Sequence, residues 1–445
     1  MFKSFKKGGK ADINNIYTLD GLVPVGKAIP FGLQHVLAMF VANIAPILIV
    51  TGVCGLSAQE TASLIQTAMI IAGIGSLIQL FPIWRFGSGL PIVMGVSFTF
   101  VSVFCYVGPT YGYSAVIGAI IIGGIIEGIL GFFAKYWRKI ISPIVAACVV
   151  TAIGFSLLSV GAYSFAGGVG VEDFGSWQNW LLGTVTLLSC IVFNAFAKGN
   201  IKQLSVLFGL VVGYILALCI GKVDFSALDG VGVVSLPKLL PYAPEFNINA
   251  IIAVVLIFLV SATETIGDTT ALASSALGRA PTDKEISGSI AVDGFVSTLS
   301  GCFGCMPITS FSQNVGLVAM TRVVNRFAIA TGAIIMIIAG IFPAVGAILA
   351  TLPEAVLGGC TIMMFGTIVV SGLQMVAKCG FSQRNMTIAA LALSIGLGFT
   401  QVPAIFGVFP ELVQTIFAEN CVAVVFLLSV VLNLVMPKDK EEKAK

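Results

Sequence analysis

Two acidic residues stand four positions apart in the stretch SATETIGD, which begins at Ser261. At this spacing Glu264 and Asp268 share one face of a helix. Two carboxylates so close together favour retaining a proton on one of them. A carboxyl that alternates between neutral and charged forms is what proton coupling requires. The alternative interpretation is a buried polar pair that binds neighbouring helices.

A second polar stretch begins at Pro307 and reads PITSFSQNVGLVAMTR. Pro307 has no backbone donor, and the residues from Thr309 to Phe311 favour an extended backbone, whereas the following residues are typical of a short helix. Non-helical backbone at membrane depth must face protein or a water-filled cavity. The stretch therefore predicts a broken membrane helix and a cavity lined by Ser312, Gln313 and Asn314. In polytopic proteins such a break usually marks the substrate site.

Three further ionisable residues fall inside apolar stretches: His35, Glu127 and Asp293. Each costs about 2.5 to 3.5 kcal/mol on insertion scales, so each needs a physical reason to be there. His35, the only histidine, either relays protons, donates a hydrogen bond to a carboxylate, or is structural. Asp293 either moves protons or caps and orients the broken helices. Glu127, which has glycine neighbours, is interpreted as structural or interfacial.

The composition is that of a polytopic membrane protein. Of the 445 residues, 58% are hydrophobic and only 10% are charged, which excludes an ordinary soluble fold. The net charge of +3 arises mostly in short loops and tails and does not indicate a nucleic-acid partner. Most cysteines lie in apolar runs, where cysteine behaves as a small hydrophobe. Cys302 and Cys305 form a CxxC motif, but a zinc site needs about four ligands and the sequence has no second CxxC. Neither a metal nor a cofactor is therefore predicted.

Fourteen segments are predicted to span the bilayer, each at or near the required length of about 20 residues. Eleven are clear: 31–53, 58–80, 113–134, 142–161, 177–197, 204–221, 248–275, 327–350, 354–376, 385–401 and 414–436. Three are interrupted by proline, glycine or polar residues: 91–106, 286–303 and 304–325. The third and tenth segments, 91–106 and 304–325, are expected to be broken, each consisting of a short strand and a half-helix.

The positions of lysine and arginine support this count. With fourteen spans, all of the 23 basic residues except Lys222 and Lys238 fall on one side of the membrane, whereas thirteen spans would scramble them. Basic residues are enriched on the cytoplasmic side, so both termini are predicted to be cytoplasmic, with tails at 1–30 and 437–445. The sequence thus predicts a multi-pass protein of the plasma membrane.

Fourteen spans divide into two halves, 31–221 and 248–436, joined by a polar linker at 222–247. Each half has an odd number of spans, so the second half must be inverted relative to the first. The breaks that begin at Pro91 and Pro307 take matching places and would face each other near the midplane, with helix N-termini offering free N–H donors. This all-α arrangement of two inverted seven-segment repeats is typical of a secondary transporter.

Several motifs resemble those of the nucleobase-ascorbate transporters, a family also called nucleobase:cation symporter-2. QNVGLVAMTR at Gln313–Arg322 resembles the family signature, and Gln34 with His35 resembles its first-helix QH motif. Three more motifs lie in the expected order: GVSF from Gly95, TETIGD from Thr263, and DG from Asp293. The resemblance covers about residues 20 to 436.

The resemblance implies a core domain of spans 1–4 and 8–11 and a gate domain of spans 5–7 and 12–14, often in a homodimer. It implies that Glu264 holds the base ring and Gln313 reads its edge, with Phe98, Ser312 and Ala42 completing the substrate contacts. A purine dione offers adjacent N–H donors and C=O acceptors, which a carboxylate and a carboxamide would match. Further residues are expected to support the site or couple it to protons: Asp268, His35, Asp293 and Asn314.

Uracil-type members carry Glu at the Gln313 position and His at the Asp268 position. The sequence therefore resembles the xanthine and uric acid permease branch, and proton-coupled uptake of those purines is expected, with a uracil or other nucleobase symporter as the alternative. An anion channel or exchanger is disfavoured because Glu264 would repel the anion. No enzyme activity is predicted, because Gly267 and Asp268 lack the GxGD context of an intramembrane protease.

Overall fold

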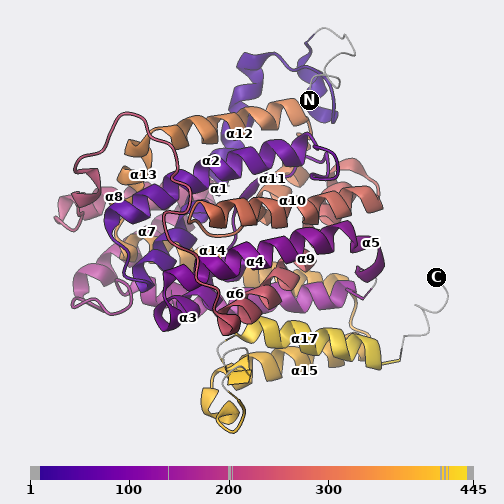
Figure 1. Cartoon of the computed structure of the whole chain (residues 1–445). Coiled ribbons are helices and arrows are strands. Elements are labelled where there is room, and N and C mark those ends of the chain that lie inside the picture. The colour runs from indigo at the N-terminus through magenta and orange to yellow at the C-terminus, as the bar shows by residue number, and fades with distance from the viewer. Residues whose placement is uncertain are drawn as a thin grey trace.

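The computed structural model describes residues 11–138, 140–198, 202, 204–410, 413–414, 417–418 and 420–437, and almost all of its regular structure is helical (Figure 1). The first half contains η2 (Ile13–Tyr17), α1 (Val25–Val53), α2 (Ala58–Leu80), β1 (Met94–Val96), η3 (Phe98–Phe100), α3 (Val101–Tyr111), α4 (Tyr113–Phe132), α5 (Ala134–Trp137), α6 (Pro143–Phe165), α7 (Trp177–Phe196) and α8 (Ser205–Cys219). After η5 (Ser226–Leu228), the second half contains α9 (Ile248–Leu277), α10 (Asp283–Cys302), β2 (Ile308–Ser310), α11 (Ser312–Thr321), α12 (Arg326–Ile341), α13 (Pro343–Ala350), α14 (Glu354–Lys378), α15 (Gln383–Thr400), η6 (Pro403–Phe406) and α17 (Cys421–Val435). Residues 1–10 and 438–445 of the predicted cytoplasmic tails lie outside the described residues.

Seven helices in the described part of the chain are long and apolar enough to cross a membrane: α1, α2, α4, α6, α7, α9 and α14. The apolar run 327–350, expected as one segment, is divided into α12 and α13 with a bend of 82°. Pro343 begins α13, and its missing N–H interrupts the helical ladder there. Only 28% of the apolar stretch of α7 is buried within the protein, so the remainder is available to lipid or to another protein chain. The protein is therefore a multi-pass membrane protein.

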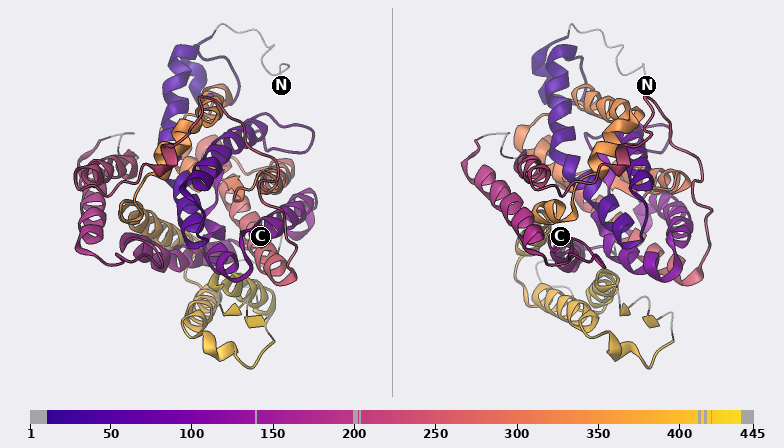
Figure 2. Two further views of the ribbon diagram at one scale, coloured as in Figure 1. Left: turned by 60° about the vertical axis from the view of Figure 1, so that its left-hand side comes forward. Right: turned by 90° about the vertical axis from the view of Figure 1, so that its left-hand side faces the viewer.

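The helices pack in recurring pairs. In Figure 1, α4, α10, α2 and α12 run side by side, and each packs against the next. Helix α1 also packs on α12, α9 packs on α4, and α6 packs along α14. The pair formed by α15 and α17 lies at the lower edge of the molecule in both views of Figure 2. A second such pair is formed by α7 and α8.

Two short strands cross inside this helical bundle. β1 and β2 form an antiparallel pair in which Gly95 lies opposite Thr309. Because each strand has only three residues, side chains satisfy the remaining backbone donors: Ser76 Oγ accepts from Met94 N at 2.9 Å, and Asn43 Oδ1 accepts from Val96 N at 2.8 Å. The extended backbone and the following short helix expected after Pro307 are present as β2 and α11.

The polar linker at 222–247 contains one short helix, η5, and otherwise follows an irregular path over the helix ends. Ser235 N donates to Ile341 O at 3.2 Å, Leu240 N donates to Cys302 O at 2.7 Å, and Glu245 N donates to Ser114 O at 3.0 Å. These bonds fix the linker to the ends of α12, α10 and α4.

Candidate functional site

A cavity of about 640 Å³ lies between the strand pair and the helices around it. Its walls come from α1, the β1–η3 junction, α6, the C-terminal end of α7, α8 with Lys202 before it, α9, the β2–α11 junction and α14. All five residues expected to contact a substrate line it: Ala42, Phe98, Glu264, Ser312 and Gln313. A cavity of this size with a few polar groups in mostly apolar walls is suited to one small molecule.

Glu264 is held by hydroxyl groups from two different elements. Its Oε2 accepts a hydrogen bond from Thr99 Oγ1 at 2.7 Å, and its Oε1 lies 3.3 Å from Ser312 Oγ. Ser312 Oγ also lies 2.9 Å from Asp268 Oδ2. The two carboxylates that share one face of α9 are therefore linked through a residue of α11. Thr99, which follows Phe98 directly, was not among the predicted site residues.

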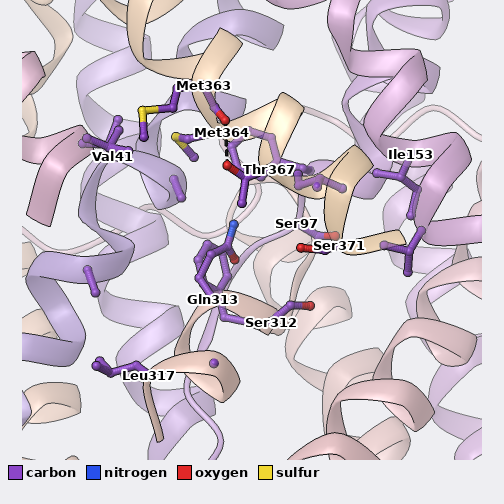
Figure 3. A pocket seen from close by; sticks show the side chains of 18 of the residues that line it. Val41, Ser97, Ile153, Ser312, Gln313, Leu317, Met363, Met364, Thr367 and Ser371 are labelled. Atoms are coloured by element: carbon purple, nitrogen blue, oxygen red, sulfur yellow. Dashed lines mark hydrogen bonds between the residues drawn. The ribbon is translucent and has the colours of Figure 1, made fainter. Parts of the chain in front are cut away.

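Gln313 faces the cavity from the first turn of α11. Figure 3 shows Gln313 and Ser312 on one side of the pocket and Thr367 and Ser371 on another. Phe98 packs edge-on against Phe365 of α14, with ring centroids 5.3 Å apart and planes at 85°. An aromatic ring and a carboxamide at one site suit a flat, polar-edged ligand.

The contribution of α14 was missed by sequence reasoning. Met363, Met364, Thr367 and Ser371 of this helix line the cavity. The spacing of four between Thr367 and Ser371 places both hydroxyls on one helix face, which was a usable signal. It is a weak signal, because Thr367 Oγ1 also bonds to the Met363 carbonyl of its own helix at 2.8 Å.

Asp293 lies on α10 and is not among the residues that line the cavity. Its Oδ2 accepts from Thr265 Oγ1 at 2.6 Å and from Ser310 N at 3.1 Å, and Ser310 Oγ donates to the same carboxylate at 3.0 Å. Of the two roles considered from the sequence, this geometry favours orienting the broken segment, since Asp293 holds the last residue of β2.

His35 and Asn314 also lie outside the cavity lining. Asn314 Nδ2 contacts His35 O at 3.4 Å and Met39 Sδ at 3.5 Å, so Asn314 joins α11 to α1. His35 Nδ1 and Asn314 Oδ1 are buried without a hydrogen-bond partner in the described part of the protein. The prediction that Asn314 lines the cavity with Ser312 and Gln313 is wrong. On a helix each residue turns by about 100°, so Asn314 faces α1 instead.

Glu127 is completely buried in α4, and neither carboxylate oxygen has a hydrogen-bond partner among the described residues. Helices α4 and α10 are in backbone contact here, because a Cβ on Gly294 would clash with Gly128 N. Full burial within one chain excludes a position on a lipid-facing or subunit-facing surface. Glu127 therefore lies inside the helix bundle, at the contact between α4 and α10.

Solved structures with a similar fold are membrane transport proteins. The transmembrane domain of a cyanobacterium bicarbonate transporter, BicA, aligns with a TM-score of 0.56 and 15% identity over 92% of this chain and 97% of that chain. SLC26A9 aligns with a TM-score of 0.60 and 13% identity over 95% of this chain and 66% of that chain. At these identities the likeness shows the fold alone.

Sequence comparison identifies the class and the family. Xanthine permease XanQ of Escherichia coli (strain K12) is 33% identical, with 96% of each chain covered. Uric acid permease PucK of Bacillus subtilis (strain 168) is 37% identical, with 84% of this chain and 87% of that chain covered. The protein is thus a transporter and not an enzyme. The family model Xan_ur_permease, described as "Permease family", matches residues 26–405, and the chain belongs to this family, the nucleobase:cation symporter-2 family.

Proposed function

We propose that this protein is a proton-coupled symporter that takes up purine nucleobases, most directly xanthine and uric acid. The observation that carries the proposal is the joint presence of Glu264 and Gln313 on one cavity of about 640 Å³. Similarity to the xanthine and uric acid permeases supports the same substrate class.

The recognition chemistry follows from the donors and acceptors of these side chains. An ionised Glu264 accepts from ring N–H groups, while the Gln313 carboxamide both donates and accepts at an edge that carries N–H and C=O groups together. The Phe98 ring and the apolar walls, which include Ala42, would cover the faces of a flat base. A pocket that forms hydrogen bonds with the edge of the base discriminates against ligands that would leave the polar groups of the pocket unpaired.

The proposed proton site is the linked pair Glu264 and Asp268. Asp268 is only 8% exposed and, in the described part of the chain, forms none of the ion pairs with Lys or Arg. A second buried negative charge beside Glu264 is unfavourable. The pair with both carboxyls ionised therefore readily takes up one proton.

The recurring helix pairs support the architecture of fourteen spans in two inverted repeats. The second span of each half packs on the fourth span of the other half, as α2 on α12 and α10 on α4. The first span of each half packs on the fourth span of the other in the same way, as α1 on α12 and α9 on α4. We assign α1 to α4 and α9 to α13 to a core domain, and α6 to α8 and α14 to α17 to a gate domain.

The ion pairs agree with the proposed orientation. Arg138 with Asp283, and Arg326 with Asp20, join segments assigned to the cytoplasmic side. Lys222 pairs with Asp173 on the side assigned to the exterior, where Lys222 holds the pKa of Asp173 below its usual range. We place the protein in the plasma membrane with both termini cytoplasmic, and the family resemblance supports a homodimer.

Uptake of four radiolabelled compounds by cells that express the protein tests this function. We expect xanthine and uric acid to accumulate and to compete with each other, because they present the same edge to Gln313. Uracil and chloride should accumulate no faster than in cells with an empty vector. Accumulation of uracil alone, or of chloride alone, would contradict the proposed substrate class.

A further inference from the structure

A single hydroxyl lies between two carboxylates at the edge of the cavity. Ser312 Oγ is 2.9 Å from Asp268 Oδ2 and 3.3 Å from Glu264 Oε1. A serine hydroxyl has one proton to donate, although its oxygen also accepts. Ser312 therefore donates to only one carboxylate at a time, and its contact with the other is a hydrogen bond only if that carboxyl is protonated.

When Asp268 is ionised, the shorter distance favours donation by Ser312 to Asp268. Glu264 then retains only the hydrogen bond from Thr99, at 2.7 Å, and faces a second negative charge. Both carboxylates are then ionised and repel each other, and Glu264 Oε1 has no donor to hold it in place. A carboxylate that is not held toward the cavity is a poor partner for a purine N–H.

When Asp268 is protonated, its own O–H donates to Ser312 Oγ, and the Ser312 hydroxyl rotates to donate to Glu264 Oε1. Glu264 is ionised in both states, but it now receives hydrogen bonds from both Thr99 and Ser312, which hold it where its free lone pairs can accept from a purine. The proton on Asp268 comes from water on the side to which the cavity opens. The Ser312 O–H bond is not broken, since the group only turns.

We propose that Ser312 is the positioning residue through which a proton on Asp268 prepares Glu264 to bind a purine. This inference rests on the proton-coupled function proposed above and gives it a structural route. A ligand and a proton that each favour the same state of the site bind with positive coupling, as symport requires.

The other ionisable groups near the pair are less suited to this role. Asp293 on α10 already accepts hydrogen bonds from Thr265 and Ser310, and Glu127 on α4 is completely buried. Lys202, which precedes α8, lines the same cavity but forms no ion pair with Glu264 or Asp268 among the described residues. His35 on α1 does not line the cavity. None of the four ion pairs in the described part of the chain includes any of these groups.

Ser312 is open to substitution because its hydroxyl is not needed to form α11. The helix begins at Ser312, and no side chain caps its N-terminus. The side chain is exposed to the cavity, so a smaller residue leaves no closed void. Thr99 provides the matched control, since its hydroxyl contacts Glu264 but not Asp268.

The test measures xanthine binding to the purified full-length protein by titration calorimetry over a range of pH. For the natural protein, the Kd should increase with pH by up to about tenfold per unit, the limit for one linked proton. Ser312→Ala should reduce this dependence to below about threefold per pH unit. Ser312→Thr, which keeps a hydroxyl, should restore it. Thr99→Ala should weaken binding by about tenfold at every pH and keep the full dependence.

Two results would overturn the role of Ser312 while leaving the proposed function intact. One is an unchanged pH dependence of the Kd in Ser312→Ala. The other is a loss of pH dependence in Thr99→Ala equal to that in Ser312→Ala. Binding by the natural protein that does not change with pH would overturn proton coupling and this inference together. An absence of xanthine binding would overturn the proposed substrate. If Ser312→Ala does not yield folded protein, Ser312→Cys, a weaker donor, should show an intermediate dependence, and a full dependence would again overturn the proposal.

Discussion

Glu264 carries the recognition chemistry at the scale of single residues, because its two oxygens have different surroundings. Oε2 is occupied by a short hydrogen bond from Thr99, at 2.7 Å, whereas Oε1 has only the longer contact with Ser312, at 3.3 Å, at the cavity. One oxygen thus fixes the side chain, and the other remains available to a ligand. The substrate contact should therefore depend on the charge of Glu264 rather than on its size.

Glu264→Gln should abolish uptake of xanthine without reducing the amount of protein in the membrane. The amide nearly preserves the shape, but it adds a donor that faces the N–H of the base. Asp173→Asn is a matched control, because Asp173 is an exposed loop carboxylate paired with Lys222. Loss of such a pair costs about 1 kcal/mol or less, so the control should transport normally. Robust xanthine uptake by Glu264→Gln would rule out direct ring contact.

Gln313→Ala should weaken purine binding by about 1 to 3 kcal/mol, the cost of leaving a buried polar partner unpaired. Gln313→Glu should instead change the ranking of bases, because it removes a donor and keeps the acceptors. Competition by unlabelled purines against labelled xanthine measures both effects. An unchanged competition profile in the two variants would place Gln313 outside the site.

At this scale the sequence does not predict which way a side chain points or which residues of other elements it contacts. Glu264 and Gln313 stand out in the sequence because charged and amide side chains are costly inside a membrane. Thr99 and Thr367 do not stand out, since a threonine in an apolar helix commonly bonds to its own backbone. Asn314 was placed in the cavity because its neighbours are there, and only the orientation of α11 shows that it contacts α1.

At the scale of elements, the antiparallel pair β1 and β2 positions both halves of the site. Phe98 and Thr99 follow β1, and Ser312 and Gln313 follow β2. The strand pair also fixes their separation, because Ser97 N donates to Pro307 O at 3.1 Å. A small shift of either strand should therefore move the aromatic ring and the hydroxyls relative to Glu264.

Gly95→Ala should impair uptake and destabilise the fold by about 1 to 3 kcal/mol, the typical cost of overpacking. A Cβ at Gly95 would lie 2.6 Å from Met39 Cε, 2.8 Å from Phe311 Cδ2 and 2.9 Å from Asn43 Oδ1. Thermal unfolding and uptake measure the two effects. Gly398→Ala on α15 is the control, because its Cβ meets no atom within 4 Å. Full uptake by Gly95→Ala would show that the strand pair tolerates displacement.

The strand and half-helix units were predictable because Pro307, like Pro91, interrupts an apolar run beside polar residues that cannot face lipid. The fixed path of the linker was not predictable, since irregular backbone is held by bonds such as that from Leu240 N to Cys302 O, which leave no pattern in the sequence. The bend at Pro343 had a readable cause, although the run around it is continuously apolar.

At the scale of the whole molecule, the cavity lies where the two proposed domains meet. Glu264 and Gln313 belong to the core side, and Thr367 and Ser371 of α14 belong to the gate side. A rocking movement of one group of helices against the other would open the cavity to each side of the membrane in turn. Coupling then requires that the proton and the purine cross together.

Asp268→Asn should impair accumulation against a gradient much more than counterflow exchange. The amide keeps a donor for Ser312, so the site can still bind a purine, but it carries no exchangeable proton to drive net uptake. Parallel measurements of exchange and of accumulation in vesicles that contain the variant test this separation. Full accumulation by Asp268→Asn would show that Asp268 is not the coupling site.

The most direct test of the central claim is xanthine uptake into sodium-free proteoliposomes that contain the natural protein. One proton that enters with a neutral base moves one charge, so an interior-negative potential of 100 mV supplies about 2.3 kcal/mol, or roughly 50-fold accumulation. We expect accumulation on this scale, larger with an added inward proton gradient and abolished by a protonophore. Accumulation that requires a sodium gradient, or that survives the protonophore, would contradict proton-coupled purine uptake.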